Sequence, residues 1–399
     1  DLVKNLPNLV SDLKGNNFQN AAEAILTTDL TLKKVLIETV IQGRKIKIAG
    51  FAKGSGMIYP NMATMLAFLT CDAGIDKDEW DKIISIAVKN SFNAIFSEEL
   101  AYMGSSAGFT LQNDITADYF VQYGTQDQIE KYVPGIISGD IITAIAMTEP
   151  GAGSDLQGVR TTAIKDGNEY VLNGSKTYIT NGQNADVIIV VAKTDPSLGA
   201  KGISLILVDA DTEGFERGRN LDKVGQHCAD TSELFFNDAR IPMTNILGEE
   251  GMGFVYLMTQ LPQERLSIAV SAMGTAQRGF DEAVKFVKDR PAFGKTVFDF
   301  QNTRFTLADL QSKLQVGWAH LDWCIERHVD GKLTNSEASV CKLWHTEMAC
   351  EVIDAALQLH GGAGYMNEYP IARMWRDARV MRIFGGTSEI MKELIGRSI

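Results

Sequence analysis

The stretch LPQERLSIA, residues 261–269, lies near the start of the longest amphipathic pattern in the chain. From Gly251 to the end of the sequence, apolar residues keep a helical period in five segments with short connections between them. Long amphipathic helices joined in this way favour an antiparallel bundle. We therefore predict a C-terminal helical bundle domain at 249–399, with helices over roughly 252–289, 300–329, 334–360, 369–382 and 387–397.

On the N-terminal side of this bundle, from about 141 to 245, the period changes toward that of strands. Turn signals such as Asn173-Gly174 and Asn181-Gly182 separate short β-rich runs. The string YVLNGSKTYITNG at 170–182 is therefore predicted to form a hairpin. The runs indicate a small antiparallel barrel or sandwich, a β domain at 146–248, with strands at 170–172, 177–180, 186–192, 203–209 and 233–236.

The first 145 residues divide into two parts. The rest of an N-terminal helical domain, 96–145, is predicted to hold two helices, Glu98–Tyr123 and Asp127–Ser138. Residues 1–95 mix patterns, and there we predict a hairpin over Lys34–Phe51, a glycine-bearing loop at 53–56, an apolar run at 65–69 and a helix over 79–92. The fold class is thus α+β, with a helical segment, a middle antiparallel β domain, a C-terminal four-helix bundle and an anomalous N-terminal segment.

Composition excludes several classes of function. The 399 residues carry a formal net charge of −12, which argues against a nucleic-acid partner. Five scattered cysteines without a CxxC pair favour free thiols in a reducing compartment. No apolar run approaches the ~18 residues that span a bilayer, so we expect no membrane span. The N-terminus lacks the pattern of a signal peptide.

Three local motifs do not carry the function that they first suggest. The GAGS string at 151–154 lacks the third glycine and the βαβ context of a dinucleotide fingerprint. The GKT string at 294–296 has Asp289 where a phosphate-binding loop needs glycine. His320 and His328, eight residues apart on a predicted helix, are more typical of a helix surface or core than of a metal site. We therefore predict no metal.

A series of longer strings is specific in its order and spacing, although each string alone is weak. The series is AMTEPGAGSD at 146–155, YVLNGSKTYITNG at 170–182, LPQERLSIA at 261–269, DRPAFGKTVFDFQ at 289–301, LQLHGGAGYMNEYPIARMWRDAR at 357–379 and RIFGGTSEIMKELI at 382–395. The first string is predicted to close a helix and enter the β domain. Together the strings resemble the acyl-CoA dehydrogenase family, most closely its long-chain type, over about residues 97–399.

This resemblance implies a homotetramer with one FAD in each subunit. It implies an oxidoreductase of fatty acid β-oxidation, which converts acyl-CoA thioesters to trans-2-enoyl-CoA and passes electrons to an electron-transfer flavoprotein. The implied compartment is the cytoplasm of a bacterium or the mitochondrial matrix of a eukaryote.

The resemblance also implies contacts at individual positions. Beside the flavin it places Ala146, Met147, Thr148, Gly153, Ser154, Tyr178 and Thr180, although Tyr178 can equally be an ordinary strand aromatic. Toward the diphosphate and adenine of a neighbouring subunit's FAD it places Arg290 and Gln301. It identifies a helix-end loop whose small residues let the cofactor approach the backbone closely, formed by Gln358, Leu359, His360, Gly361 and Gly362. Thr387 and Glu389 begin the last helix, whose free N–H groups favour phosphate oxygens. The implied substrate contacts are Ser154, Pro262, Gln263, Arg265, Gly385 and Gly386.

The catalytic base is assigned by the same resemblance. Most members of the family carry the base in the final motif, where this chain has Gly385, and glycine offers no carboxylate. The long-chain type carries a glutamate on the first helix of the bundle, which here is Glu264. A solvated helix carboxylate paired with Arg265 or Lys288 is the alternative. If Glu264 is the base, we expect substrate binding to expel water and raise its pKa toward neutrality.

Residues 1–95 resemble a different family, the glutamate/ornithine N-acetyltransferases, through AEAILTTD at 22–29, AKGSGMIYPNMATMLAFLTCDA at 52–73 and NSFNAI at 90–95. That resemblance implies substrate contacts at Thr28 and Lys53, self-cleavage between Ala63 and Thr64, and Thr64 as a nucleophile. The chain thus looks chimeric, through natural fusion, engineered or mistaken assembly, or a wrongly assigned stretch of sequence. Two alternatives to the dehydrogenase follow: a flavin-binding but inactive scaffold, and a threonine-nucleophile N-acetyltransferase.

Overall fold

The computed structural model describes residues 33–41, 44–53, 66–71, 93–104 and 110–399. The chain divides into two compact units, Asp1–Ile84 and Ser85–Ile399. The described part of the first unit is an antiparallel sheet of β1 (Lys33–Ile41), β2 (Arg44–Lys53) and β3 (Leu66–Cys71), in that order. Ile41 pairs with Arg44, so two residues connect β1 to β2, and the predicted hairpin is confirmed.

Several predictions for the N-terminal segment lie outside the described residues. They are the helix over 79–92, the glycines of the 53–56 loop, and Thr28 and Thr64 with the cleavage position between 63 and 64. Lys53 is the last residue of β2. The structure therefore does not test these predictions.

The second unit opens with helices that differ in part from the prediction. They are α4 (Asn93–Tyr102), the π-helical turn η2 (Leu111–Thr116), α5 (Ala117–Tyr123) and α6 (Gln126–Ser138). The single helix predicted over 98–123 is wrong, because the chain turns after Tyr102 and Gly104 adopts a positive φ of 73°. The second helix is confirmed: Thr125 caps it and left-handed Gly139 ends it.

A seven-stranded sheet follows, with the order β4-β7-β5-β6-β10-β9 and β8 paired with β7. Its strands are β4 (Thr143–Ala146), β5 (Thr162–Asp166), β6 (Glu169–Thr180), β7 (Val187–Lys193), β8 (Ile203–Asp209), β9 (Phe215–Asn220) and β10 (Thr231–Pro242). The strands β7 and β8 are buried from end to end of their shared ladder apart from Lys193 and Asp209, and every buried residue except Ser204 is apolar. The AMTEPGAGSD string therefore begins at the end of a strand, rather than at the close of a helix.

The hairpin predicted for 170–182 is wrong, because β6 runs unbroken through Asn173-Gly174. Gly174 pairs with Phe236 of β10 within the ladder. A Cβ at Gly174 would lie 2.8 Å from the Cα of Thr161, so the glycine permits a close approach of two backbones. The turn instead lies before the strand, at Gly167-Asn168, where Asp166 pairs with Glu169. Asn181-Gly182, the second turn signal, does follow β6.

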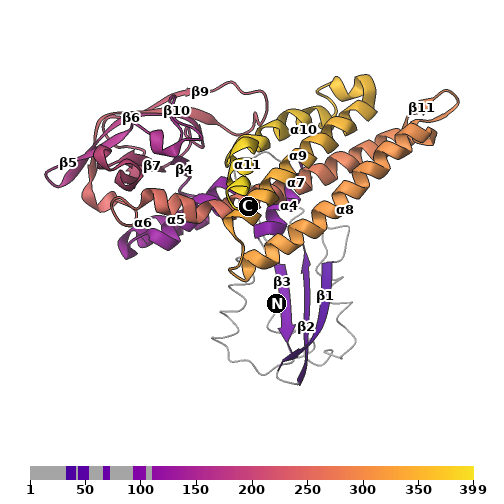
Figure 1. Cartoon of the computed structure of the whole chain (residues 1–399), viewed down its shortest axis with the longest axis horizontal. Coiled ribbons are helices and arrows are strands. Elements are labelled where there is room, and N and C mark those ends of the chain that lie inside the picture. Colours follow the sequence, from indigo (N-terminus) through magenta and orange to yellow (C-terminus); the bar gives the residue numbers. More distant parts are fainter. Residues whose placement is uncertain (1–32, 42–43, 54–65, 72–92, 105–109) are drawn as a thin grey trace, which may run out of the picture. The chain divides into compact units, whose positions relative to one another are not determined.

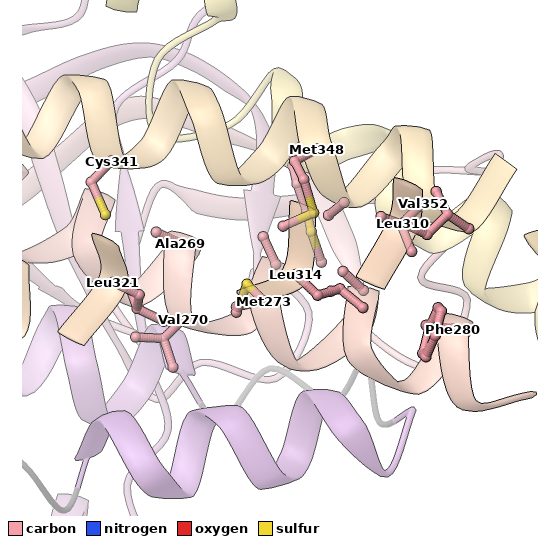
Figure 2. Close-up of a cluster of buried hydrophobic side chains, with 14 of the residues drawn as sticks. Ala269, Val270, Met273, Phe280, Leu310, Leu314, Leu321, Cys341, Met348 and Val352 are labelled. Atoms are coloured by element: carbon pink, nitrogen blue, oxygen red, sulfur yellow. The ribbon is translucent and has the colours of Figure 1, made fainter. Parts of the chain in front are cut away.

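The C-terminal bundle confirms the five predicted helical segments. It contains α7 (Gly253–Asp289), α8 (Gln301–Val329), α9 (Asn335–His360), α10 (Pro370–Ala378) and α11 (Ser388–Gly396), and 379–382 is a 3-10 turn after α10. A two-stranded ribbon, β11 (Pro291–Ala292) and β12 (Lys295–Thr296), joins α7 to α8 (Figure 1). Buried side chains of α7, α8 and α9 form one apolar core, including Met273, Leu314 and Met348 (Figure 2). Within the described residues, no helix is long and apolar enough to cross a membrane.

Candidate active site

Glu264 lies in the interior, on the twelfth residue of α7, and its exposed fraction is only 5%. Burial raises the pKa of its carboxyl to about 7, although a hydrogen bond from Tyr119 works in the opposite direction. The Tyr119 hydroxyl donates this bond to Oε1 at 3.0 Å. A carboxylate with a pKa near 7 is suited to accept a proton under ordinary conditions.

The alternative ion pairs for Glu264 are not formed. Arg265, the next residue, directs its guanidinium toward α9, where Nη1 lies 3.3 Å from both Asn335 Oδ1 and Ser339 Oγ. Lys288 is exposed near the other end of α7. Among the described residues, no salt bridge joins a cation to Glu264. The carboxylate is therefore buried without a neutralising partner, which explains its raised pKa.

The glycine pair of the final motif packs close to the helix that carries Glu264. Gly385 has a left-handed φ of 64°, and a Cβ there would lie 2.3 Å from Cδ1 of Ile268. Ile268 is one helical turn after Glu264 on α7. The carbonyl oxygen of Gly386 accepts a 2.7 Å hydrogen bond from the buried ammonium of Lys342. Backbone, rather than a side chain, thus occupies this side of the site.

Pro262 and Gln263 are half-buried on the same turn of α7. The Gln263 side-chain oxygen is buried and, within the described structure, has no hydrogen-bond partner. An unpaired buried acceptor costs free energy, so a donor from a bound molecule would stabilise it.

The residues predicted beside a flavin meet at the ends of β4 and β6. Thr148 donates from Oγ1 to the carbonyl oxygen of Thr177 at 2.8 Å, and the Thr177 N–H donates to the Thr148 carbonyl oxygen at 2.9 Å. Ala146, the last residue of β4, is buried, whereas Met147, Thr148 and Thr180 are half-buried. Tyr178 is 69% exposed and has a left-handed φ of 61°. A large aromatic held in this strained, exposed conformation indicates a function other than core packing.

A buried ion pair anchors the loop that follows β4. Lys176 Nζ lies 2.8 Å from Glu149 Oε1, and both side chains are buried. The Glu149 carboxylate also accepts from the backbone N–H groups of Arg160 and Thr161, and Lys176 donates to the Met147 carbonyl oxygen. Gly153 and Ser154 lie exposed on the loop that these bonds hold in place.

Contacts through η2 and α5 connect this loop region to Glu264. Gln112 of η2 accepts at its side-chain oxygen from the N–H of Thr143, the first residue of β4, at 2.8 Å. Asn181, just after β6, donates to the Thr143 carbonyl oxygen at 3.0 Å. Tyr119, which bonds Glu264, follows on α5. Hydrogen bonds through η2 and α5 therefore connect the elements that carry the predicted flavin residues to the helix that carries the predicted base.

The remaining cofactor residues form a second group at the other end of α7. Arg290 caps the C-terminus of that helix, and Gln301 begins α8. His360 of α9 stacks on Phe286 at 4.4 Å between ring centroids, which brings Gln358–Gly362 to the same end of the bundle. Gln358, Gly361 and Gly362 are exposed, Leu359 is half-buried and His360 is buried. Arg290 is 26 residues beyond Glu264, or about 39 Å along the helix axis.

Thr387 and Glu389 lie where the sequence predicts, at the start of α11. Thr387 is the N-cap, and its hydroxyl accepts from the N–H of Ile390 at 3.3 Å. Glu389 is exposed in the first turn. One backbone donor at this terminus is therefore already satisfied by the chain itself.

Sequence reasoning missed four residues of this region: Tyr119, Glu149, Lys176 and Lys342. Tyr119 is 145 positions from its partner, and no local pattern indicates such a pair. Lys176 does carry a signal, because it stands at an inward position of a strand pattern. A lysine there requires a buried partner.

Comparisons with known proteins agree with this architecture. Models described as the N-terminal, middle and C-terminal domains of acyl-CoA dehydrogenases match residues 87–140, 144–239 and 251–399. A model described as the ArgJ family matches residues 1–99. Both resemblances inferred from the sequence are confirmed, and the matched ranges overlap at residues 87–99.

Individual relatives cover most of the second unit. The mitochondrial long-chain specific acyl-CoA dehydrogenase of Sus scrofa is 50% identical over 309 residues, which are 77% of this chain and 72% of that protein. The acryloyl-CoA reductase (NADH) of Anaerotignum propionicum is 42% identical over 280 residues, 70% of this chain and 71% of that protein. The crystal structure of an acyl-CoA dehydrogenase from Geobacillus kaustophilus superposes with a TM-score of 0.76 at 51% identity, covering 77% of this chain and 82% of that one.

Proposed function

The chain belongs to the acyl-CoA dehydrogenase family, and from that premise we propose that it oxidises long-chain acyl-CoA thioesters to trans-2-enoyl-CoA with Glu264 as the base. The observation that carries this proposal is the buried, unpaired Glu264 carboxylate, whose pKa burial raises to about 7. The preference for long chains is supported by the 50% identity to a long-chain specific relative. It is also supported by the glycine at 385, which leaves Glu264 as the carboxylate of this site.

Members of this family are FAD flavoproteins, and the residues of this chain fit that cofactor. Exposed Tyr178 stands beside the half-buried hydroxyl of Thr180, as a flat ring with polar edges requires. At the other end of the bundle, a Cβ at Gly362 would meet nothing within 4 Å. Packing within the chain does not require that glycine, so close approach of a ligand explains it better.

The proposed division of labour follows from the geometry. Bound FAD would supply a hydride acceptor for the β-carbon of the substrate. Glu264 removes the α-proton, and Tyr119 holds its carboxylate in position. The backbone at Gly385 packs directly against Ile268, one helical turn from Glu264, and so bounds this side of the proposed substrate site. Ala146–Thr148 and Thr180 would bind the cofactor ring. Gln263, whose side-chain oxygen is buried without a partner, would face the substrate, and Ser154 would reach it from the loop. The guanidinium of Arg265 is directed to α9 instead.

The second group, around Arg290 and Gly362, is too far from Glu264 for one cofactor to contact both within a single chain. We therefore assign Arg290, Gln301 and Gln358–Gly362 to the FAD of a neighbouring subunit in a homotetramer. Thr387 and Glu389 directly follow Gly385 and Gly386, on the Glu264 side of the bundle, so we assign them to phosphate oxygens of the FAD bound there. An electron-transfer flavoprotein is the proposed acceptor of the electrons.

Anaerobic mixing of the purified protein with acyl-CoA thioesters of increasing chain length tests the proposal. We expect the flavin absorbance to bleach, fastest with long chains. A protein that binds FAD but never bleaches would contradict the activity and favour an inactive scaffold. Oxidation of NADH with an enoyl-CoA would instead indicate a reductase, the activity named for the Anaerotignum relative.

The ArgJ-family match at residues 1–99 supports a second candidate, the threonine-dependent N-acetyltransferase through Thr64. Mass spectrometry of the intact protein distinguishes it. Cleavage between residues 63 and 64, together with acetyl transfer to glutamate, would support it. A single uncleaved chain would exclude it.

A further inference from the structure

Helices α8 and α9 carry four potential metal ligands on their facing surfaces. His320 and Cys324 lie four residues apart on α8, and Cys341 and His345 lie four residues apart on α9. A spacing of four places both members of each pair on one face of their helix. None of the four belongs to the proposed cofactor or substrate residues.

The order of the ligands is mirrored about the connection between the two helices. In a pair of antiparallel helices, a step forward along one helix is level with an equal step back along the other. Cys324 lies four residues after His320 on α8, and Cys341 lies four residues before His345 on α9. His320 should therefore face His345, and Cys324 should face Cys341. The imidazole rings of His320 and His345 do stack, with centroids 5.4 Å apart and planes within 5°.

Three of the four residues form a compact group of ligand atoms, and Cys324 lies beside it, next to His320. Ligand atoms of His320, Cys341 and His345 all lie within 4.8 Å of one another. Cys324 Sγ is 3.6 Å from His320 Nε2, and Cys341 Sγ is 3.5 Å from His345 Nδ1. Zn–S and Zn–N bonds of about 2.3 and 2.0 Å at a tetrahedral angle place sulfur and nitrogen about 3.5 Å apart.

The hydrogen bonds of His345 also point to a missing partner. Its Nδ1 lies 2.7 Å from the carbonyl oxygen of Cys341, and its Nε2 lies 3.0 Å from that of Gly317. A neutral imidazole has one N–H and can donate to one of these oxygens, which leaves a lone pair facing the other. Metal ligands commonly resolve this conflict, with one nitrogen on the metal and the other donating to a backbone carbonyl. The contact with Gly317 can serve as that outer bond.

We propose that His320, Cys324, Cys341 and His345 bind one zinc ion in a closed, structural site. Binding forms two Zn–S and two Zn–N bonds and releases the two thiol protons to solvent. Two thiolates balance the charge of Zn²⁺, so a neutral group is buried. Cys341 and His345 are fully buried, and Figure 2 shows the Cys341 side chain directed from α9 into the core. The ion would fasten α8 to α9 and does not depend on the proposed dehydrogenase activity.

Metal analysis of the full-length protein, together with cobalt substitution, tests this proposal. After removal of loosely bound ions, we expect about one zinc per chain. Replacement by Co²⁺ should produce the visible absorption of a tetrahedral site and a thiolate-to-cobalt band. Protein without zinc and without a cobalt spectrum after addition of either ion would overturn the proposal. A mass lower by two hydrogen atoms, restored by reductant and traced by peptide mapping to Cys324 and Cys341, would show instead that these two thiols form a disulfide.

Single substitutions assign the ligands. Cys341→Ala and His320→Ala should each lower the zinc content at least tenfold, and added Zn²⁺ should no longer raise Tm by several degrees. Cys350→Ala, also on α9 but outside the cluster, should keep both properties. Unchanged zinc in Cys341→Ala would contradict the assignment. If that variant does not fold, the cobalt spectrum of the unmodified protein still decides the question.

Discussion

Two glutamates of this protein are buried to nearly the same degree but have opposite electrostatic properties. Glu264 on α7 is 5% exposed and Glu149 after β4 is 7% exposed. Burial raises the pKa of Glu264 to about 7. For Glu149, burial also favours the protonated form, but Lys176 and two backbone N–H groups outweigh it and lower the pKa.

The difference lies in the partners. Lys176 neutralises Glu149 inside the sheet. This carboxylate therefore stays ionised and holds a loop in place. Glu264 receives one hydrogen bond from Tyr119, and the charge of Arg265, which forms no ion pair with it, is too weak to offset burial. Burial therefore raises the pKa of a carboxyl only where no cation pairs with it, and such a carboxyl is a candidate for a catalytic base. The pKa of Glu264 is near neutrality before any substrate binds, which is earlier than we expected from the sequence.

The largest effect should follow from removing the base. We expect Glu264→Gln to lower the rate of turnover with acyl-CoA by about 10²–10⁴-fold, because general base catalysis typically contributes that much. FAD content should not change. Steady-state assays with an artificial electron acceptor measure the loss. Glu282→Gln, on the same helix, is the matched control and should retain full activity.

Breaking the paired carboxylate should instead affect stability. Lys176→Met leaves Glu149 buried and uncompensated, so we expect the free energy of unfolding to fall by about 3–5 kcal/mol. Urea denaturation measures the change. Lys165→Met removes the exposed pair with Glu250 and should cost less than about 1 kcal/mol. Similar losses in both variants would contradict the role assigned to the buried pair.

The same Glu264→Gln substitution should stabilise the protein at high pH. Between the ordinary pKa of 4.5 and the folded value of about 7, the folded chain holds a proton that the unfolded chain has released. The stability of the unmodified protein therefore falls as pH rises through this window, by about 3 kcal/mol in total. Glutamine carries no such charge. Denaturation at pH 8 and pH 5 should show a gain for the variant at pH 8 that largely disappears at pH 5.

The smallest effect concerns the hydrogen bond to the base. Tyr119→Phe removes a donor that favours the charged carboxylate, so the pKa of Glu264 should rise by about one unit. The rate at pH 7 should fall by up to about tenfold and recover at higher pH. Tyr123→Phe, one helical turn later on α5 and stacked on Tyr256, should leave the pH profile unchanged. A loss in Tyr119→Phe that is equal at every pH would show a purely structural role.

Much of the architecture could be predicted from the sequence wherever one apolar period continues over a long segment. The bundle helices keep a 3.6-residue apolar period over 26 to 37 residues, and their predicted bounds agree with the structure within a few positions. The prediction failed at Asn173-Gly174, where a local turn signal was overridden by pairing with β10 and by the close approach of Thr161. Ladder pairing depends on residues more than 60 positions away.

The candidate site shows the same limit. Glu264 could be found because its motif is local, but its partner Tyr119 could not. The proposed zinc ligands could be predicted only in part. Their spacing of four is visible in the sequence, whereas the facing of α8 and α9 requires the fold. His320 was therefore read as a surface or core residue until the structure brought it next to His345.

The pH dependence of flavin bleaching in a single anaerobic turnover tests the central claim most directly. With long-chain acyl-CoA, we expect a bleaching rate that rises with pH to a plateau, with an apparent pKa near 7. In Glu264→Gln we expect a rate that is at least about 10²-fold slower and does not rise with pH in this range. A limb near pH 4.5, or full bleaching by the Glu264→Gln protein, would show that another group takes the α-proton.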